Sequence, residues 1–126
     1  MSLIKYAFAT AMVLAAAGTA QAQPQHKLVR DLDKGTIQAI WCSSLFFEES
    51  YYHESGGRDA TRYEDMAFEL GADLDGELID TYGLRQEEVD EIWSVFDSAA
   101  YDMAELNDET FLEQVEACES GYDALL

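Results

Sequence analysis

The chain has 126 residues, and its 26 acidic against 7 basic residues give a formal net charge of -19 at pH 7. Phosphates and anionic lipids would repel so acidic a chain, which excludes nucleic acids and membrane surfaces as natural partners. The charge favours a basic protein or a cation as partner, although an acidic surface also serves solubility alone. The sequence does not specify an oligomeric state.

Residues 1–22 have the pattern of a cleaved bacterial signal peptide. Lys5 gives a positive start, residues 6–17 are mostly apolar, and Ala20-Gln21-Ala22 forms an A-x-A cleavage site. The apolar run is too short to span a bilayer, so we expect no membrane insertion once the signal is removed. The protein is therefore predicted to be periplasmic or secreted.

The rest of the chain, residues 23–126, is long enough for one domain with a modest core. Residues 23–33 are polar and show no apolar period, so we expect a flexible arm in which His26 is solvated. Residues 34–126 are expected to form a single helical domain. Its acidic character is strongest in the second half, where residues 86–126 contain 13 Asp and Glu and no Lys or Arg.

The stretch from Thr36 to Glu54 is predicted to be the central helix, because a helix that is apolar on most sides is buried among neighbours. One broad face of this helix holds Ile37, Ile40, Trp41, Ser44, Leu45, Phe47, Tyr51 and Tyr52. A second stripe, on nearly the opposite side, holds Cys42, Phe46, Glu49 and His53. Asp33 or Thr36 can cap the start of the helix, and Gly56-Gly57 ends it.

Three further helices are predicted from apolar residues that recur every three or four positions. The first begins after Arg58, stops at Gly83, and has its stripe at Tyr63, Ala67, Leu70, Leu74 and Leu78. The next spans residues 86–106, with a stripe of Val89, Ile92, Trp93, Phe96, Ala99, Ala100 and Met103. The last is capped by Asn107 and aligns Phe111, Val115, Cys118 and Tyr122. Four amphipathic helices with short connections predict an all-α fold, a small four-helix bundle with up-and-down topology.

Cys42 and Cys118 are the two cysteines of the chain, and in an exported protein we expect them to form one structural disulfide. This bond would join the first and last helices of the bundle. It would close a loop of about 77 residues, which contributes about 4 kcal/mol on the chain-entropy model. The chain has no C-x-x-C pair, so redox activity is not expected.

The end of the central helix holds the best candidate binding surface. Its tyrosines and acids suit a basic or cationic partner, and the residues are Glu48, Glu49, Tyr51, Tyr52, His53 and Glu54. Tyr51 and Tyr52 could equally cap the end of the core. Glu48 lies on the broad apolar face, so it is either buried with hydrogen-bond partners or marks where this face reaches solvent. We favour the second interpretation, because buried unpaired glutamates are rare.

Glu49 and His53 lie one turn apart and could hold a divalent metal or pass a proton. A single helical histidine gives little metal specificity, and an exposed i,i+4 pair explains the same spacing, so no metal site is assigned. No serine or cysteine stands in a nucleophile context, and no glycine-rich phosphate loop is present. We therefore expect no enzyme activity and no cofactor.

Together these features predict a small exported acidic protein that binds a basic or cationic partner. Two alternatives stay open. An acid-responsive chaperone-like protein would fit the size, charge and single disulfide, because protonation of the carboxylates could loosen the bundle. A metal-binding protein or minor enzyme would be centred on Glu48, Glu49 and His53.

Overall fold

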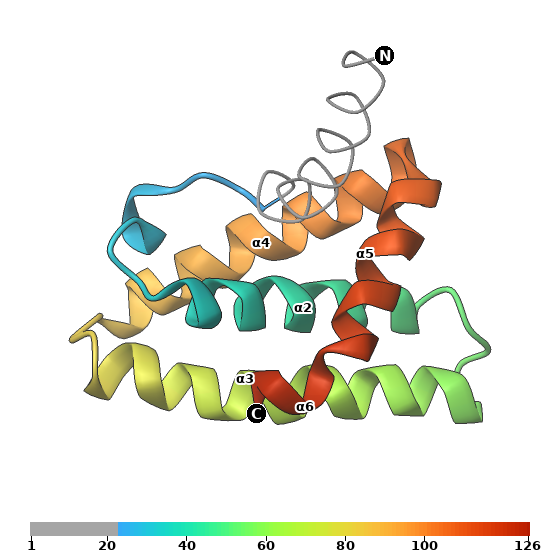
Figure 1. Ribbon diagram of the computed structural model, residues 1–126, viewed down its shortest axis with the longest axis horizontal. Helices are drawn as coiled ribbons and strands as arrows, with labels where there is room; N and C mark the ends of the chain where they lie inside the picture. The colour runs from blue at the N-terminus through green and yellow to red at the C-terminus, as the bar shows by residue number, and fades with distance from the viewer. Residues whose placement is uncertain (1–22) are drawn as a thin grey trace, which may run out of the picture.

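The structure is a computed structural model that describes residues 23–126, and every regular element in that range is helical (Figure 1). The expected signal peptide, residues 1–22, lies outside the described residues. The elements are a 3-10 turn at Lys27–Val29 and the helices α2 (Lys34–Ser50), α3 (Arg58–Asp80), α4 (Gln86–Leu106), α5 (Asp108–Ser120) and α6 (Tyr122–Leu125). They confirm the all-α bundle. None of the described helices is long and apolar enough to cross a membrane.

Helix α2 lies at the centre of the fold, between α3 and α4, and α5 crosses it (Figure 1). Its core residues are fully inaccessible to water: Ile40, Trp41, Cys42, Leu45 and Phe46. The ring of Trp41 lies edge-on to Phe96 of α4, and its Nε1 donates a hydrogen bond of 3.3 Å to Oε1 of Gln114 in α5. A single α2 side chain thus joins three helices, and rings of this size supply much of the hydrophobic stabilisation.

The predicted apolar stripes of the other helices form the rest of the core. Helix α3 buries Tyr63, Ala67, Leu70, Leu74 and Leu78, and α4 buries Val89, Ile92, Phe96 and Ala100. The chain leaves α3 through Gly83, whose φ of +67° is the left-handed conformation that glycine adopts at a helix end. Helix α5 begins at Asn107, whose side chain accepts a hydrogen bond from the Thr110 backbone N–H. Both the stop and the cap are confirmed.

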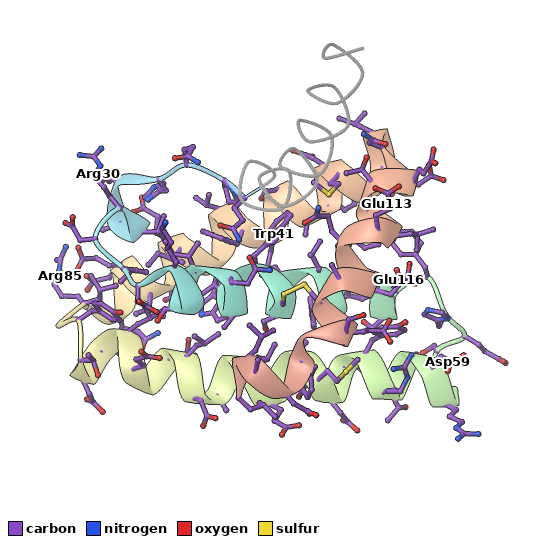
Figure 2. All side chains as sticks on the ribbon, viewed as in Figure 1. Arg30, Trp41, Asp59, Arg85, Glu113 and Glu116 are labelled. Carbon is purple, nitrogen blue, oxygen red and sulfur yellow. A yellow bond between two sulfur atoms is a disulfide. The ribbon has the colours of Figure 1, made fainter. Side chains whose placement is uncertain are left out.

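The disulfide between Cys42 and Cys118 is also confirmed, with the two Cα atoms 5.6 Å apart. It joins α2 to α5 at the point where the two helices cross (Figure 2). Helices α2, α3 and α4 run in alternating directions, and after α5 the chain ends beside α3 (Figure 1). There the Tyr122 hydroxyl donates to Oε2 of Glu69 at 2.9 Å. The last part of the chain is therefore attached to both α2 and α3.

The segment before α2 is held by more contacts than its polar composition predicted. Val29 and Leu32 are buried in the core, at 5% and 8% exposure. Nδ1 of His26 accepts a hydrogen bond from the Leu28 backbone N–H. The apolar period is absent because the segment is not an α-helix: Val29 ends a 3-10 turn, and Leu32 lies in the bend that follows it. The flexibility of residues 23–33 stays a prediction, but two of their side chains belong to the core.

Candidate cation-binding site

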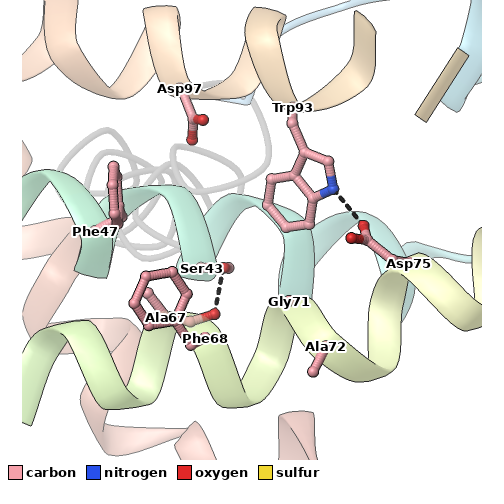
Figure 3. Close-up of a pocket in the computed structure, with 9 residues that line it drawn as sticks. All are labelled: Ser43, Phe47, Ala67, Phe68, Gly71, Ala72, Asp75, Trp93 and Asp97. Atoms are coloured by element: carbon pink, nitrogen blue, oxygen red, sulfur yellow. Dashed lines mark hydrogen bonds between the residues drawn. The ribbon is translucent and has the colours of Figure 1, made fainter. Parts of the chain in front are cut away.

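An open cleft of about 450 Å³ lies between α2, α3 and α4 (Figure 3). Each of these helices contributes one aromatic wall: Phe47 comes from α2, Phe68 from α3 and Trp93 from α4. The full lining is Ser43, Phe47, Ala67, Phe68, Gly71, Ala72, Asp75, Trp93 and Asp97. The cleft is thus a product of the tertiary arrangement and belongs to no single stretch of sequence.

The floor of the cleft is formed by small residues of α3, which leave space above the helix. A Cβ at Gly71 would lie 3.7 Å from Oγ of Ser43 and 3.9 Å from the Trp93 ring, so glycine leaves this space free. Ala67 and Ala72 add only methyl groups beside it. Oγ of Ser43 donates a hydrogen bond of 2.8 Å to the Ala67 carbonyl, and this bond holds α2 against α3 at the floor of the cleft. The two helices are therefore in close contact at the floor, while the small side chains of α3 leave the space above it open.

The aromatic walls continue onto the surface. Phe68 is 61% exposed and Tyr51 is 66% exposed, although both are large apolar rings. Both rings pack edge-on against Phe47, whose ring centroid is 6.0 Å from that of Phe68 and 5.2 Å from that of Tyr51. No element of the described chain covers these rings. Exposed apolar groups gathered beside a hollow are typical of binding surfaces.

Two carboxylates give the cleft a negative charge (Figure 3). Oδ1 of Asp75 accepts a hydrogen bond of 2.6 Å from Nε1 of Trp93, which fixes the indole ring. Asp97 lies across the cleft, where partial loss of solvent raises the pKa of its carboxyl and the neighbouring Ser44 hydroxyl offsets part of that rise. A cation in the cleft would meet both a carboxylate and an aromatic face, the two groups that attract it most strongly.

The negative charge extends from the cleft along the line between α2 and α4. The Tyr52 hydroxyl lies 3.2 Å from Oε1 of Glu48 and 3.2 Å from Oε1 of Glu105. It has one proton and can donate to only one of these carboxylates at a time. Burial raises the pKa of Glu48, the Tyr52 hydrogen bond opposes the rise, and the charges of Glu105 and Asp97 add to it. Glu48 is half-buried, in agreement with our preference for a face that reaches solvent there.

Basic residues do not neutralise this region. The six Lys and Arg of residues 23–126 lie in the N-terminal segment or at helix starts: Lys27, Arg30, Lys34, Arg58, Arg62 and Arg85. Figure 2 places Arg30 and Arg85 together at one end of the molecule. No residue that lines the cleft is basic. The middle of the α2–α4 surface therefore carries a net negative charge.

The structure corrects the prediction for Glu49. We expected an exposed pair with His53, but Glu49 is only 6% exposed, and its Oε1 lies 2.9 Å from Nε2 of His53. The reason is that Cys42, Phe46 and Glu49 share one stripe, and α5 covers this stripe through the disulfide. Oε2 of Glu49 is buried without a hydrogen-bond partner. Glu49 is also one of the residues that line a smaller pocket, which is separate from the cleft.

His53 belongs to a network that holds α2 to α3 and α5. Its ring stacks on Tyr63 with centroids 5.2 Å apart, and the Tyr63 hydroxyl donates to Oε1 of Glu119 at 2.7 Å. The Arg62 guanidinium lies over the Tyr63 ring and pairs with Glu119 at 3.1 Å. Burial and the Glu119 carboxylate raise the pKa of Tyr63 to about 12. In the part of the chain that the structure describes, no group of three or more His, Cys, Asp or Glu is placed to hold a metal ion.

The predicted surface is therefore divided among several places. Tyr51 borders the cleft, Glu48 and Tyr52 lie between α2 and α4, Glu49 is buried, and Glu54 is exposed. The cleft residues Phe68, Trp93 and Asp97 were not predicted from the sequence as site residues. One indication was available, because Phe68 is an aromatic residue that lies off the apolar stripe of its own helix.

Comparisons of the chain with protein-family models, with curated proteins and with solved structures find no match.

Proposed function

We propose that the protein is an exported binding module that holds a basic segment of a partner protein in the cleft between α2, α3 and α4. One observation carries the proposal: three aromatic rings and two carboxylates, from three helices, surround an open hollow that no basic residue lines. Soluble proteins usually cover rings such as Phe68 unless a partner does so. The strongly negative charge of the chain makes that partner basic.

The cleft offers a lysine or arginine side chain two complementary contacts. Its charged end can pair with Asp97 or Asp75, and its stem or guanidinium plane can lie on Trp93 or Phe68. A contact of this kind contributes roughly 0.5–2 kcal/mol. The long-range negative potential would raise the association rate, since it draws a basic partner toward the surface before contact.

Export completes the proposal. The signal-like residues 1–22 and the disulfide both support a periplasmic or extracytoplasmic location, because disulfides persist in oxidising compartments. In that location the proposed partner is a basic protein, and neither a nucleic acid nor a membrane surface.

The experiment is calorimetric titration of residues 23–126 with a peptide rich in lysine and arginine, and with an acidic peptide of the same length. We expect binding of the basic peptide alone, weakened strongly as salt rises from about 50 mM to about 500 mM. Phe68→Ala should weaken binding about tenfold. Tyr101→Ala is the matched control, because Tyr101 is 54% exposed on α4 and does not line the cleft. Equal affinity of the two variants would refute a role for the cleft.

The acid-responsive alternative receives no support from the shifted carboxyls. Burial raises the pKa of Glu48 and of Asp97, so the folded protein takes up protons at both groups more readily than the unfolded chain does. Their contribution to stability therefore grows as pH falls through the raised pKa values, which opposes loosening by acid.

A further inference from the structure

The side-chain hydrogen-bond donors that line the cleft between α2, α3 and α4 are already engaged within the protein. Oγ of Ser43 donates to the Ala67 carbonyl. Nε1 of Trp93 donates to Oδ1 of Asp75. The remaining polar side-chain atoms of the lining are carboxylate oxygens, which only accept while they are ionised. A ligand in the cleft must therefore be recognised through the aromatic rings and through its charge, because no side-chain donor is free to bind it.

Three rings that a ligand can reach line this cleft (Figure 3). Phe68 is 61% exposed, and Phe47 and Trp93 are half-buried. The planes of Phe47 and Phe68 meet at 61°, so the two rings present differently oriented surfaces. The hydrogen bond to Asp75 holds the indole of Trp93 in place, with its Cζ2 and Cη2 atoms beside Gly71. The aromatic surface is thus formed before a ligand arrives, and it includes tryptophan, the ring that attracts cations most strongly.

The chemistry of the lining distinguishes between kinds of cation. A primary ammonium has three N–H groups, and each gives up a hydrogen bond to water when the group moves against a ring. The rings do not replace these bonds, and Asp75 already accepts from Trp93. A quaternary ammonium has no N–H group, so it loses no hydrogen bond, and its methyl groups bring the positive charge onto the rings. The carboxylates attract it without direct contact.

We propose that the cleft selects a quaternary ammonium group over a primary one, with its methyl groups packed on the rings of Phe68 and Trp93 and with Asp97 nearby as the counter-ion. The inference rests on the proposed function, because it names the class of cation that the same cleft prefers. The group can belong to a small molecule or to a trimethylated lysine of the basic partner, since both present the same chemistry. A ligand that also carries a carboxylate is disfavoured, because Asp75 and Asp97 repel it.

The test is a set of amide NMR titrations of residues 23–126 with choline, ethanolamine and 3,3-dimethyl-1-butanol. Ethanolamine has a primary ammonium in place of the quaternary group, and dimethylbutanol keeps the shape of choline without its charge. We expect saturable shifts at Phe68, Gly71 and Ala72 with choline, and none with dimethylbutanol. Ethanolamine should bind the same residues about fivefold more weakly than choline. Glycine betaine, which adds a carboxylate to the trimethylammonium group, should also bind about fivefold more weakly.

A pair of matched variants tests the contact with the ring. Phe68→Leu keeps an apolar side chain but removes the ring, and should weaken choline about threefold. The fold should tolerate this change, because Phe68 is exposed and does not belong to the buried core. Tyr101→Leu makes the same kind of change at an exposed ring of α4 outside the cleft, and should bind choline as the original does. Equal choline affinity of Phe68→Leu and the original would refute the ring contact.

The outcomes separate this inference from the proposed function. If ethanolamine binds as tightly as choline while Phe68→Ala still weakens the basic peptide, the selection for quaternary ammonium is overturned and the proposed function stands. If choline saturates at the cleft while the basic peptide is indifferent to Phe68→Ala, the basic segment is refuted and the quaternary site stands. Choline shifts that do not saturate, or that gather away from Phe68 and Gly71, would overturn the inference.

A capped Gly-Lys-Gly peptide, with and without trimethylation of its lysine, separates the two ligand sources. Tighter binding of the trimethylated peptide at Phe68 and Gly71 would extend the selection to protein side chains. Equal binding of the two peptides, with choline still preferred over ethanolamine, would restrict it to small molecules.

Discussion

Reduction of the disulfide should remove a large part of the stability of the fold. Cys42 and Cys118 are 76 positions apart, so the bond restricts a long loop of the unfolded chain. On the chain-entropy model this contributes between about 4 and 4.5 kcal/mol at room temperature. Domains of this size have free energies of unfolding of about 5–15 kcal/mol, so the reduced protein is expected to be close to marginal.

The measurement is guanidinium unfolding followed by circular dichroism, with and without reductant. With a slope of about 3 kcal/mol per molar, the midpoint should fall by about 1.5 M on reduction. If reduction lowers the midpoint by less than about 0.3 M, the reasoning is refuted, because the bond would then barely restrict the unfolded state. The double variant with Cys42→Ser and Cys118→Ser is the control. Its midpoint should be as low as that of the reduced protein, or lower because two hydroxyls are buried, and should not respond to reductant.

Four further substitutions test the packing of the core and the shape and charge of the cleft. Phe96→Ala removes a fully buried ring beside Trp41 and should cost about 3–5 kcal/mol in chemical unfolding. Gly71→Ala adds a Cβ at ordinary contact distances in mid-helix and should stabilise by about 0.5–1 kcal/mol, and Gly71→Leu should also fill the cleft and abolish binding of the basic peptide. Asp97→Asn should raise the free energy of unfolding at pH 7, because burial raises the pKa of Asp97 above its ordinary 3.8 and so disfavours the charged form in the fold. The gain should shrink as the pH falls through the raised pKa toward 3.8, and an unchanged pH dependence of unfolding would contradict this.

The helices could be predicted because the residues that determine each of them lie close together in the sequence. The stripe of α3, the Asn107 cap and the Gly83 stop each depend on residues a few positions apart, and each is where the pattern placed it. The end of α2 was predicted less well. The helix ends at Ser50, before the two glycines, so Tyr51 and Tyr52 do not continue the ideal helical positions assigned to them.

The candidate sites could not be derived in the same way, because they depend on which helix covers which face. Angular positions on a helical wheel are the same whether α5 packs over Glu49 or over Glu48. From the sequence, Glu48 was the glutamate whose burial was in question, but the crossing of α5 at Cys42 buries Glu49. Phe68 and Asp97, likewise, come together only because α3 and α4 both lie against α2.

The two tryptophans of the chain occupy different environments, which makes them separate optical reporters. Trp41 is closed in the core against Gln114, so its emission should be blue-shifted and should change only when the fold opens. Trp93 forms a wall of the cleft and donates to Asp75, so its emission should respond to a ligand there while the fold stays intact. With Trp93→Phe as the reference, one emission spectrum would distinguish occupancy of the cleft from unfolding without any added label.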